Sequence, residues 1–168
     1  ERQSSITILD ANGKVLTRYG EIKGNSVDIN EIPQTLIQAV MAIEDRRFYS
    51  HFGIDLLGLM RAVVVNMQAG GVVQGGSTVT QQLAKNLFLT PTRTLRRKVQ
   101  EALLAFWLEQ TFTKDELLSI YLNRVYLGAA TFGFEGASRR YFGKSVRRVS
   151  LHEAAMLAGL LKAPSRYS

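Results

Sequence analysis

The chemistry suggested by this sequence starts from one carboxylate at the end of an apolar stretch. The segment 42–55, AIEDRRFYSHFGID, places Glu44 where the apolar stripe of a helix gives way to a loop, with Asp45 beside it and Phe48 and His51 following. Burial against such apolar neighbours raises the pKa of a carboxylate into the range of a general base or acid at neutral pH. The alternative is an exposed helix end with solvated charges, and the spacing alone favours that alternative.

A second carboxylate lies beside two cations. Arg97 and Lys98 precede Glu101 at i−4 and i−3, so all three side chains project from one side of a helix. Such a group can be a surface ion pair worth only about 0.3–0.5 kcal/mol, and the spacing alone favours this. It can also form a cationic groove that holds an anion next to a carboxylate.

A glycine-rich segment lies between these two groups. In 75–86, GGSTVTQQLAKN, glycines and hydroxyls precede a helix N-terminus, where free amides and the helix dipole attract phosphate. Thr78 and Gln81 form a capping box, but a cap does not explain Ser77, Gln82 and Lys85. The segment is not a Walker loop, because the Gly-Lys-Ser/Thr order is absent.

The elements that must position these residues are mostly helices. The runs 6–9 and 15–19 flank Asn12 and Gly13, which predicts a small N-terminal β-hairpin followed by a loop at 20–32. From Pro33 the apolar period becomes helical, and this helix should end close to Glu44. A second helix at about 55–68 is apolar over much of its circumference, which predicts a central place in the core. The glycine-rich 69–76 should end it and be mobile.

The second half of the chain also predicts helices. The segment 94–112 should form a long amphipathic helix, and 117–127 another one closed by Gly128. Capping boxes predict two further helix starts, at Thr113 with Glu116 and at Ser150 with Glu153. The expected core stripe of the long helix consists of Leu95, Val99, Ala102 and Phe106.

Composition limits the class of protein. The 168 residues suit one domain, and 46% hydrophobic with 21% charged residues indicates a globular chain. The net charge of +7 favours an anionic partner, whether nucleic acid, an anionic membrane surface or a phosphate-bearing substrate. The absence of cysteine excludes cysteine catalysis.

No apolar stretch in the sequence replaces a membrane anchor. The longest ones, such as 102–108 and 154–161, are far shorter than the roughly 20 residues that a spanning helix needs. The chain begins at Glu1 without a Met and stops at Ser168, so we expect its flanks to carry a membrane anchor or further domains.

Taken together, these segments resemble the peptidoglycan glycosyltransferases of family 51, found as the transglycosylase domain of class A penicillin-binding proteins and as monofunctional enzymes. The resemblance runs from about Ile32 to Ser168. The first two family motifs, Glu-Asp-x-x-Phe-x-x-His-x-Gly and Gly-x-Ser-Thr-x-Thr-Gln-Gln, match 44–53 and 75–82. The others, Arg-Lys-x-x-Glu and Lys-x-x-Ile-Leu-Glu-x-Tyr-Leu-Asn, match 97–101 and 114–123, with Ser119 in place of the last glutamate.

The resemblance implies a mainly α, lysozyme-like fold with a larger lobe, a smaller membrane-facing lobe and a cleft between them, in addition to the small N-terminal β-hairpin that the sequence predicts. A hairpin and linker at 1–31 would precede the glycosyltransferase domain at 32–168. The implied reaction polymerises lipid II. The growing chain is the donor, linked through pyrophosphate to a polyprenyl lipid, and the 4-hydroxyl of lipid II attacks it with inversion to give a β-1,4 bond.

The resemblance also assigns roles to the residues. Glu44 is the general base on the acceptor hydroxyl, and Asp45 beside it either orients Glu44 or repels it into protonation. Glu101, the second catalytic residue, orients the nearby cations, binds a divalent ion or steadies the leaving group rather than acting as an acid. The cations for the pyrophosphate are Lys85, Arg93, Arg97 and Lys98, and the donor is bound by Ser77, Thr78 and Gln82.

Cofactors and partners follow from the same resemblance. It predicts no dedicated metal site and leaves open a divalent cation, Mg²⁺ or Mn²⁺, near the pyrophosphate. The expected partners are lipid II, the growing glycan chain, a membrane surface and a phosphoglycolipid inhibitor of the moenomycin type, with no nucleic acid. The expected location is the outer, periplasmic face of the bacterial cytoplasmic membrane.

Two other functions remain as alternatives. A muramidase or lytic transglycosylase shares the lysozyme-like fold and a catalytic glutamate but cleaves the polymer, and it has no use for the cations of 85–98. A non-catalytic membrane or nucleic-acid binding module would need a continuous exposed basic stripe with stacking aromatics. Here the basic residues gather in the same motifs as the two glutamates.

Overall fold

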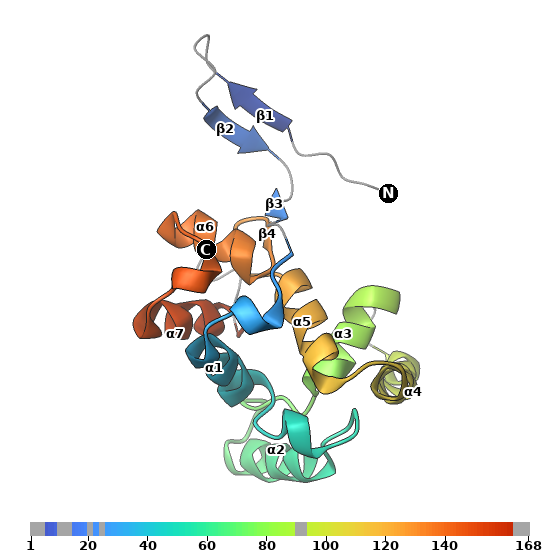
Figure 1. Ribbon diagram of the computed structural model, residues 1–168. Coiled ribbons are helices and arrows are strands. Elements are labelled where there is room, and N and C mark those ends of the chain that lie inside the picture. Colours follow the sequence, from blue (N-terminus) through green and yellow to red (C-terminus); the bar gives the residue numbers. More distant parts are fainter. Residues whose placement is uncertain (1–5, 10–14, 20–21, 24–25, 90–93, 163–168) are drawn as a thin grey trace. The chain divides into compact units, whose positions relative to one another are not determined.

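The computed structural model describes residues 6–9, 15–19, 22–23, 26–89 and 94–162. These residues are mainly helical, as the sequence predicts (Figure 1). The chain divides into two compact units: a middle unit, Ile37–Tyr121, and a terminal unit made of Glu1–Leu36 together with Leu122–Ser168. Helices α1 (Gln34–Glu44) and α5 (Lys114–Arg124) each contain one of the two points where the chain passes between units.

The terminal unit begins with the predicted hairpin. Strands β1 (Ile6–Leu9) and β2 (Val15–Tyr19) pair antiparallel, with Ile6 opposite Tyr19. The predicted turn at Asn12 and Gly13 lies outside the described residues. The expected loop at 20–32 was only partly right, because it contains strand β3 (Ile22–Lys23) and the 3-10 helix η1 (Ile29–Glu31). Strand β3 pairs in parallel with β4 (Thr131–Phe132).

The rest of the terminal unit is helical. Helix α6 (Phe134–Phe142), the 3-10 helix η3 (Val146–Arg148) and α7 (Leu151–Leu160) follow β4. The buried Glu135 joins α6 to η3, because its carboxylate accepts from the Val146 amide and the Ser145 hydroxyl. The predicted capping box of Ser150 and Glu153 opens α7, and the Lys144 ammonium helps to hold the pKa of Glu153 at about 2.

The middle unit contains η2 (Phe48–Ser50), α2 (Leu56–Gln68), α3 (Val79–Phe88) and α4 (Leu95–Thr111), with the larger parts of α1 and α5. Helix α3 packs against α4, and the contact is apolar because Val79, Leu83, Ala105 and Leu108 are all buried. The capping boxes predicted at Thr78 and Thr113 are both present. The helix starts were therefore predictable from local sequence.

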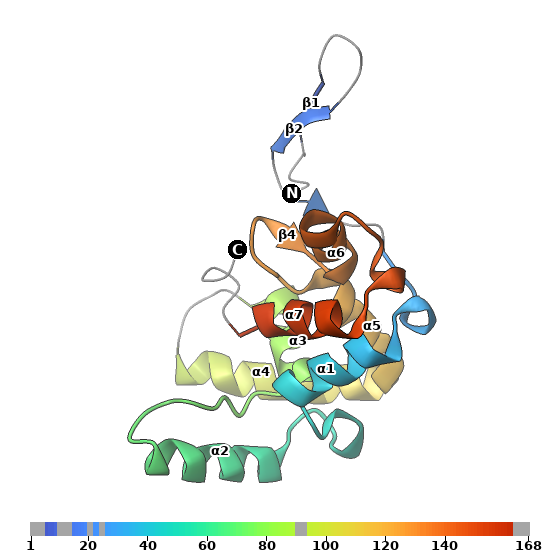
Figure 2. The ribbon, with the colours of Figure 1, turned by 90° about the vertical axis from the view of Figure 1, so that its left-hand side faces the viewer.

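Helix α2 corrects one prediction. Its bounds are as expected, but it is not central in the core, because Ala62 is its only described residue that is buried. Most of its large apolar side chains are exposed, from 45% for Leu59 to 77% for Met67, and α2 lies at the periphery of its unit in both views (Figures 1 and 2). The apolar circumference of α2 therefore marks an exposed surface rather than a buried one.

None of the described helices is long and apolar enough to cross a bilayer.

The segment after α2 folds back on the end of that helix. The Asn66 side chain accepts from the backbone amides of Val73 and Gln74 and donates to the Gln74 carbonyl. Val72 and Val73 are 90% and 63% exposed, so the apolar surface of α2 continues onto this segment.

The predicted core stripe of α4 was also wrong. Leu95, Val99 and Phe106 are exposed, and the buried face is formed by Glu101, Ala105, Leu108 and Glu109. The two glutamates can be buried because cations pair with them, as described below. Helix α5 ends at Arg124 rather than near Gly128. The chain then forms a tight turn in which the Thr131 amide donates to the Gly128 carbonyl.

That turn contains two alanines in the left-handed region, Ala129 with φ 46° and Ala130 with φ 55°. This conformation costs a residue with a Cβ about 1–2 kcal/mol. We expect Ala130→Gly to raise the free energy of unfolding by up to about 1 kcal/mol, because glycine avoids that cost while losing more chain entropy on folding. Thermal unfolding should show a melting temperature higher by a few degrees.

The matched control is Ala155→Gly, which makes the same chemical change at an exposed position within α7. In a helix interior glycine lowers stability by about 1 kcal/mol relative to alanine. Shifts of the same sign in both variants would contradict the strain assigned to the turn.

Candidate active site

Every predicted site residue that the structure describes belongs to the middle unit. Arg93, the remaining predicted site residue, lies outside the described residues. The other residues form two side-chain clusters, one around Glu44 and one around Glu101. The first cluster contacts Gln82 in α3, and the second contacts Ser77, just before α3.

Glu44 is the last residue of α1, and its carboxylate is held by a neighbour on another helix. The Gln82 side chain amide, from α3, donates to Glu44 Oε2 over 2.5 Å. Both side chains are half-buried. Glu44 is therefore not the freely solvated helix end that the spacing alone favoured. A partly covered carboxylate that still contacts solvent can exchange protons with a bound hydroxyl.

Asp45 is turned into the protein and serves its structure. Its side chain is only 3% exposed, and both its oxygens lie within 3.0 Å of His51 Nε2. The same carboxylate accepts from the backbone amide of Val79, the first residue of α3. Since a carboxylate only accepts, His51 must donate from Nε2. His51 thus holds the Asp45 carboxylate in place.

Thr78 also stabilises the start of α3. It caps α3 by accepting from the Gln81 amide, and its hydroxyl donates to the Gly53 carbonyl over 2.6 Å. Gly53 has a φ of +78°, and an added Cβ would lie 3.1 Å from the Ala105 carbonyl oxygen. Thr78 is 2% exposed. Asp45 and Thr78 therefore fix where α3 begins, and this places Gln82 opposite Glu44.

Glu101 is the centre of the second cluster. It is 3% exposed, and its two oxygens bind different cations: Oε1 accepts from Arg97 Nη1, and Oε2 accepts from Lys98 Nζ over 2.8 Å. Lys98 Nζ also donates to Ser77 Oγ over 2.7 Å, while 47% of the Lys98 side chain stays exposed. Two cations around one carboxylate leave one net positive charge at the surface. The arrangement is more than the surface ion pair that the spacing allowed.

Lys85 follows Gln82 by three residues on α3, in the last turn of that helix. It is half-buried, and within the described part of the chain it makes no ion pair or hydrogen bond. Its ammonium is thus available to an anionic ligand. Among the predicted pyrophosphate cations, Lys98 is held by contacts with Glu101 and Ser77, whereas Lys85 makes no such contact within the described part of the chain.

The structure also contains a buried polar group that sequence reasoning missed. Glu109 on α4 accepts from the Thr80 hydroxyl over 2.6 Å and from Lys114 Nζ over 2.7 Å. Lys114 also lies over the Phe48 ring, 4.4 Å from its centroid. The available signal was the spacing of Glu109 from Glu101, which puts both on one face of a helix. This group connects α3, α4 and α5 and is structural.

Tyr121, part of the motif at 114–123, is another buried polar residue of the middle unit. It is 1% exposed, and its hydroxyl has no hydrogen-bond partner among the described residues. Burial, and after it the negative charge of Glu44, raise the pKa of this hydroxyl. Tyr121 therefore keeps its proton at any physiological pH.

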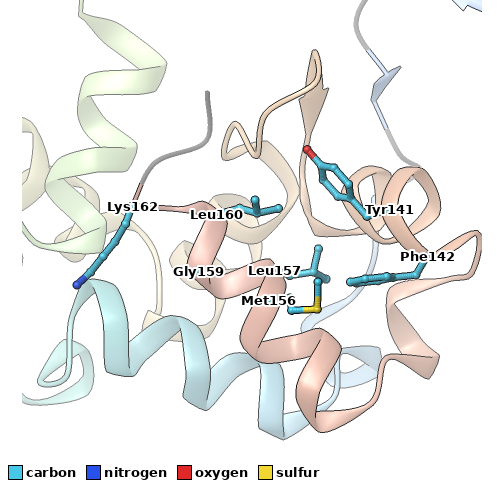
Figure 3. A pocket seen from close by; sticks show the side chains of 7 residues that line it. All are labelled: Tyr141, Phe142, Met156, Leu157, Gly159, Leu160 and Lys162. Carbon is cyan, nitrogen blue, oxygen red and sulfur yellow. The ribbon is translucent and has the colours of Figure 1, made fainter. Parts of the chain in front are cut away.

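The terminal unit contains a pocket of a different character. A cavity of about 550 Å³ is lined mainly by apolar side chains of α6 and α7, among them Phe142, Met156 and Leu157 (Figure 3). None of the described residues that line it is a predicted site residue. In the described part of the chain, no three His, Asp or Glu side chains converge as metal ligands.

Comparison with known proteins identifies the class. The family described as transglycosylase matches residues 12–168, so the chain belongs to the transglycosylase family. The predicted resemblance to the peptidoglycan glycosyltransferases is confirmed, and with it the prediction of an enzyme of that kind.

The individual relatives are penicillin-binding proteins 1A. The protein of that name from Aquifex aeolicus (strain VF5) is 52% identical over 161 residues, and the one from Neisseria cinerea is 50% identical over 163 residues. These matches cover 96% and 97% of this chain but 22% and 20% of the relatives. The chain spans about a fifth of the length of the curated relatives that it matches.

The role given to Asp45 can be tested by stability. We expect Asp45→Asn to lower the free energy of unfolding by about 1.5–3 kcal/mol, because the neutral side chain weakens the hydrogen bonds from His51 and Val79 and puts an NH2 group, which cannot accept, in place of one carboxylate oxygen. Urea unfolding followed by circular dichroism measures this loss.

Asp115→Asn is the matched control. Asp115 is exposed and accepts from the Tyr49 hydroxyl, so its loss should cost about 1 kcal/mol or less. Equal, small losses in the two variants would show that Asp45 does not hold the start of α3.

Proposed function

We propose that this domain polymerises lipid II into β-1,4-linked glycan strands with release of polyprenyl pyrophosphate. The observation that carries the proposal is the connection of a half-buried carboxylate to a cation cluster through one helix. Gln82 on α3 holds Glu44, and Ser77, just before α3, contacts Lys98 of the cluster around Glu101. A base for a hydroxyl and cations for a leaving phosphate are the two requirements of this reaction.

The reaction places each group in a role. Glu44 takes the proton from the 4-hydroxyl of lipid II, and the oxygen attacks the anomeric carbon of the growing chain. The bond from that carbon to the pyrophosphate oxygen breaks, and the pyrophosphate leaves with the electron pair. Attack from the face opposite the leaving group converts the α-linked phosphate into a β bond.

Charge on the leaving pyrophosphate increases in the transition state, so cations already fixed in place stabilise it most. Lys98 is fixed by Glu101 and Ser77, and Lys85 has no competing partner in the described structure. Arg97 and Arg93 complete the proposed cation set. Glu101 is buried beneath Arg97 and Lys98, which supports an orienting role rather than that of an acid.

The donor and the partners complete the proposal. Ser77 and Gln82 bind the donor, and Asp45 and Thr78 act by positioning α3. A divalent cation at the pyrophosphate would supplement the lysines and arginines, and no step above depends on it. A phosphoglycolipid inhibitor of the moenomycin type would compete for the same cations. Catalysis is assigned to residues 32–168, with the hairpin and linker at 1–31 outside it.

We assign the domain to the outer face of the bacterial cytoplasmic membrane, held there by an anchor beyond these residues. The exposed apolar side chains of α2 and its following segment support this location, since contiguous apolar surface of this kind suits a lipid interface. A muramidase is the second candidate function, and a polymer-cleaving enzyme gains nothing from the cations around Glu101.

The first test is polymerisation of labelled lipid II without any nucleotide sugar. We expect activity in the wild type and a loss of at least about 10²-fold in Glu44→Gln, because the amide cannot accept the proton. Gel separation of the labelled glycan products gives the measurement.

The matched control is Glu116→Gln, at an exposed helix start where glutamine preserves the capping box. It should keep full activity. Full activity in Glu44→Gln refutes the base, and shortening of added glycan by the wild type favours the muramidase.

A second test concerns the cations. Lys98→Ala should lower kcat/KM by about 10²-fold or more, because it removes a preorganised donor to the leaving group. The melting temperature should fall by only a few degrees, because Arg97 still pairs with the buried Glu101.

Arg148→Ala, an exposed change in the terminal unit, removes the same charge and controls for the general attraction of anionic substrates. Equal losses in both variants would show that Lys98 contributes only to that general attraction.

A further inference from the structure

Besides joining α3, α4 and α5, Lys114 contacts the turn that follows the proposed base. Lys114 is the first residue of α5, and its ammonium donates to Glu109 Oε1 over 2.7 Å. The same ammonium lies 4.4 Å from the centroid of the Phe48 ring. Only 20% of the Lys114 side chain and 2% of the Glu109 side chain are exposed. A lysine that is mostly covered needs partners for its charge, and Lys114 has a carboxylate and an aromatic face at once.

The Phe48 ring belongs to the 3-10 helix that comes directly after the base. Glu44 ends α1, and η2 begins at Phe48, whose amide donates to the Asp45 carbonyl over 3.1 Å. Phe48 is 1% exposed, so packing fixes its place. The next residue of η2, Tyr49, donates to Asp115, the next residue of α5. The start of α5 therefore holds the turn after Glu44 at two consecutive positions.

Glu109 connects Lys114 to the same base by a second route. Its Oε1, which accepts from Lys114, also accepts from the Thr80 hydroxyl over 2.6 Å. Thr80 is buried on α3, two residues before Gln82, whose side-chain amide donates to Glu44. The contacts thus form a closed ring within the middle unit, which runs from Glu44 through α3, α4, α5 and η2 back to Glu44.

A closed ring restrains the base more than a single contact does. Each element in it is held from two sides, so Glu44 cannot move away from Gln82 without disturbing a buried contact elsewhere in the ring. Lys114 is the link that joins Glu109 to Phe48. The position of a base matters for the rate, because a displacement of about 1 Å can cost about 10²-fold.

We propose that Lys114 is a positioning residue, which keeps the Glu44 carboxylate where it can take the proton of the acceptor hydroxyl. This inference rests on the proposed function, in which Glu44 is the base. Lys114 acts through Phe48 on one side of Glu44, and through Glu109 and Thr80 on the other. Because this role requires no contact with the substrate, loss of Lys114 should lower kcat and leave KM nearly unchanged.

The experiment measures kcat and KM of lipid II polymerisation for Lys114→Met and Lys114→Arg, well below their melting temperatures. Methionine keeps the length of the side chain without its charge, and arginine keeps the charge and the donors. We expect kcat of Lys114→Met to fall by about tenfold or more with KM within about twofold of the wild type, and Lys114→Arg to keep most of the wild-type kcat. An unchanged kcat in Lys114→Met, a loss confined to KM, or an equal loss of kcat in Lys114→Arg overturns the inference.

A double variant separates loss of position from loss of stability. Lys114→Met alone leaves the buried Glu109 carboxylate without its cation, which destabilises the protein. Adding Glu109→Gln removes that unpaired charge, while the glutamine oxygen can still accept from Thr80. The double variant should regain most of the melting temperature and keep the low kcat, and it takes the place of Lys114→Met if that variant does not fold. Recovery of both properties would show an ion pair that serves stability alone and would overturn the inference.

Lys144→Met is the matched control. The Lys144 ammonium pairs with Glu153 over the same distance, 2.7 Å, but in the terminal unit. The two side chains are 32% and 14% exposed, so the same substitution again leaves a largely covered carboxylate without its cation. It should lower the melting temperature and leave kcat unchanged. A fall in kcat as large as that of Lys114→Met would show that any lost ion pair has this effect.

A readout that needs no activity separates this inference from the proposed function. In protein with ¹⁵N-labelled glutamine, the side-chain amide signal absent from Gln82→Ala identifies Gln82, and its shift in Glu44→Gln marks the loss of the charged acceptor. Lys114→Met should move this signal toward its position in Glu44→Gln, and Lys144→Met should leave it unmoved. An unmoved signal in Lys114→Met overturns the inference. If the wild type fails to polymerise lipid II, the proposed function fails, while this signal still decides whether Lys114 holds Glu44 against Gln82.

Discussion

The contact on which the rest of the site depends is the one between the Asp45 carboxylate and the first amide of α3. A helix N-terminus carries unsatisfied amides, and a buried carboxylate needs donors, so the two groups stabilise each other. His51 supplies the second donor and keeps Asp45 in place. Because Glu44 precedes Asp45 directly in the chain, the turn that ends α1 fixes both the proposed base and the start of α3. Gln82, Thr78 and Ser77 then take their positions from that helix.

This arrangement separates two kinds of polar residue within the same motifs. Asp45, Thr78 and Glu101 are buried, and protein groups already bind their oxygens. Gln82, Lys85 and Lys98 are partly exposed and keep donors that a substrate can use. A motif in a sequence presents both kinds alike, because each is polar and each is required. Only burial and contacts distinguish a residue that positions a helix from one that contacts the substrate.

The sequence predicted where helices start more accurately than it predicted which helix faces are buried. The caps at Thr78, Thr113 and Ser150 depend on residues three positions apart, which are visible in the sequence, and the structure contains all three. Periodicity shows which side chains share a face, but not whether anything packs on that face. It therefore failed for α2 and for the outer stripe of α4, which are exposed, and it could not show that Glu101 and Glu109 would be the buried side chains of α4. Their burial depends on cations and a hydroxyl from Arg97, Lys98, Lys114 and Thr80, and Thr80 is distant in sequence from Glu109, its partner.

The exposed apolar surface of α2 and the positively charged cluster around Glu101 have a common explanation under the proposed function. An exposed apolar helix is unfavourable in water, and a cluster with a net positive charge is unfavourable against hydrocarbon. A polyprenyl pyrophosphate carries both complementary groups in one molecule, an apolar chain and an anionic head. One compact unit holds the exposed side chains of α2 and the cations around Glu101, so it can bind both parts of such a ligand. The polar cluster must then keep its geometry beside a low-dielectric phase, and the buried contacts of Asp45, Thr78 and Glu109 provide that rigidity.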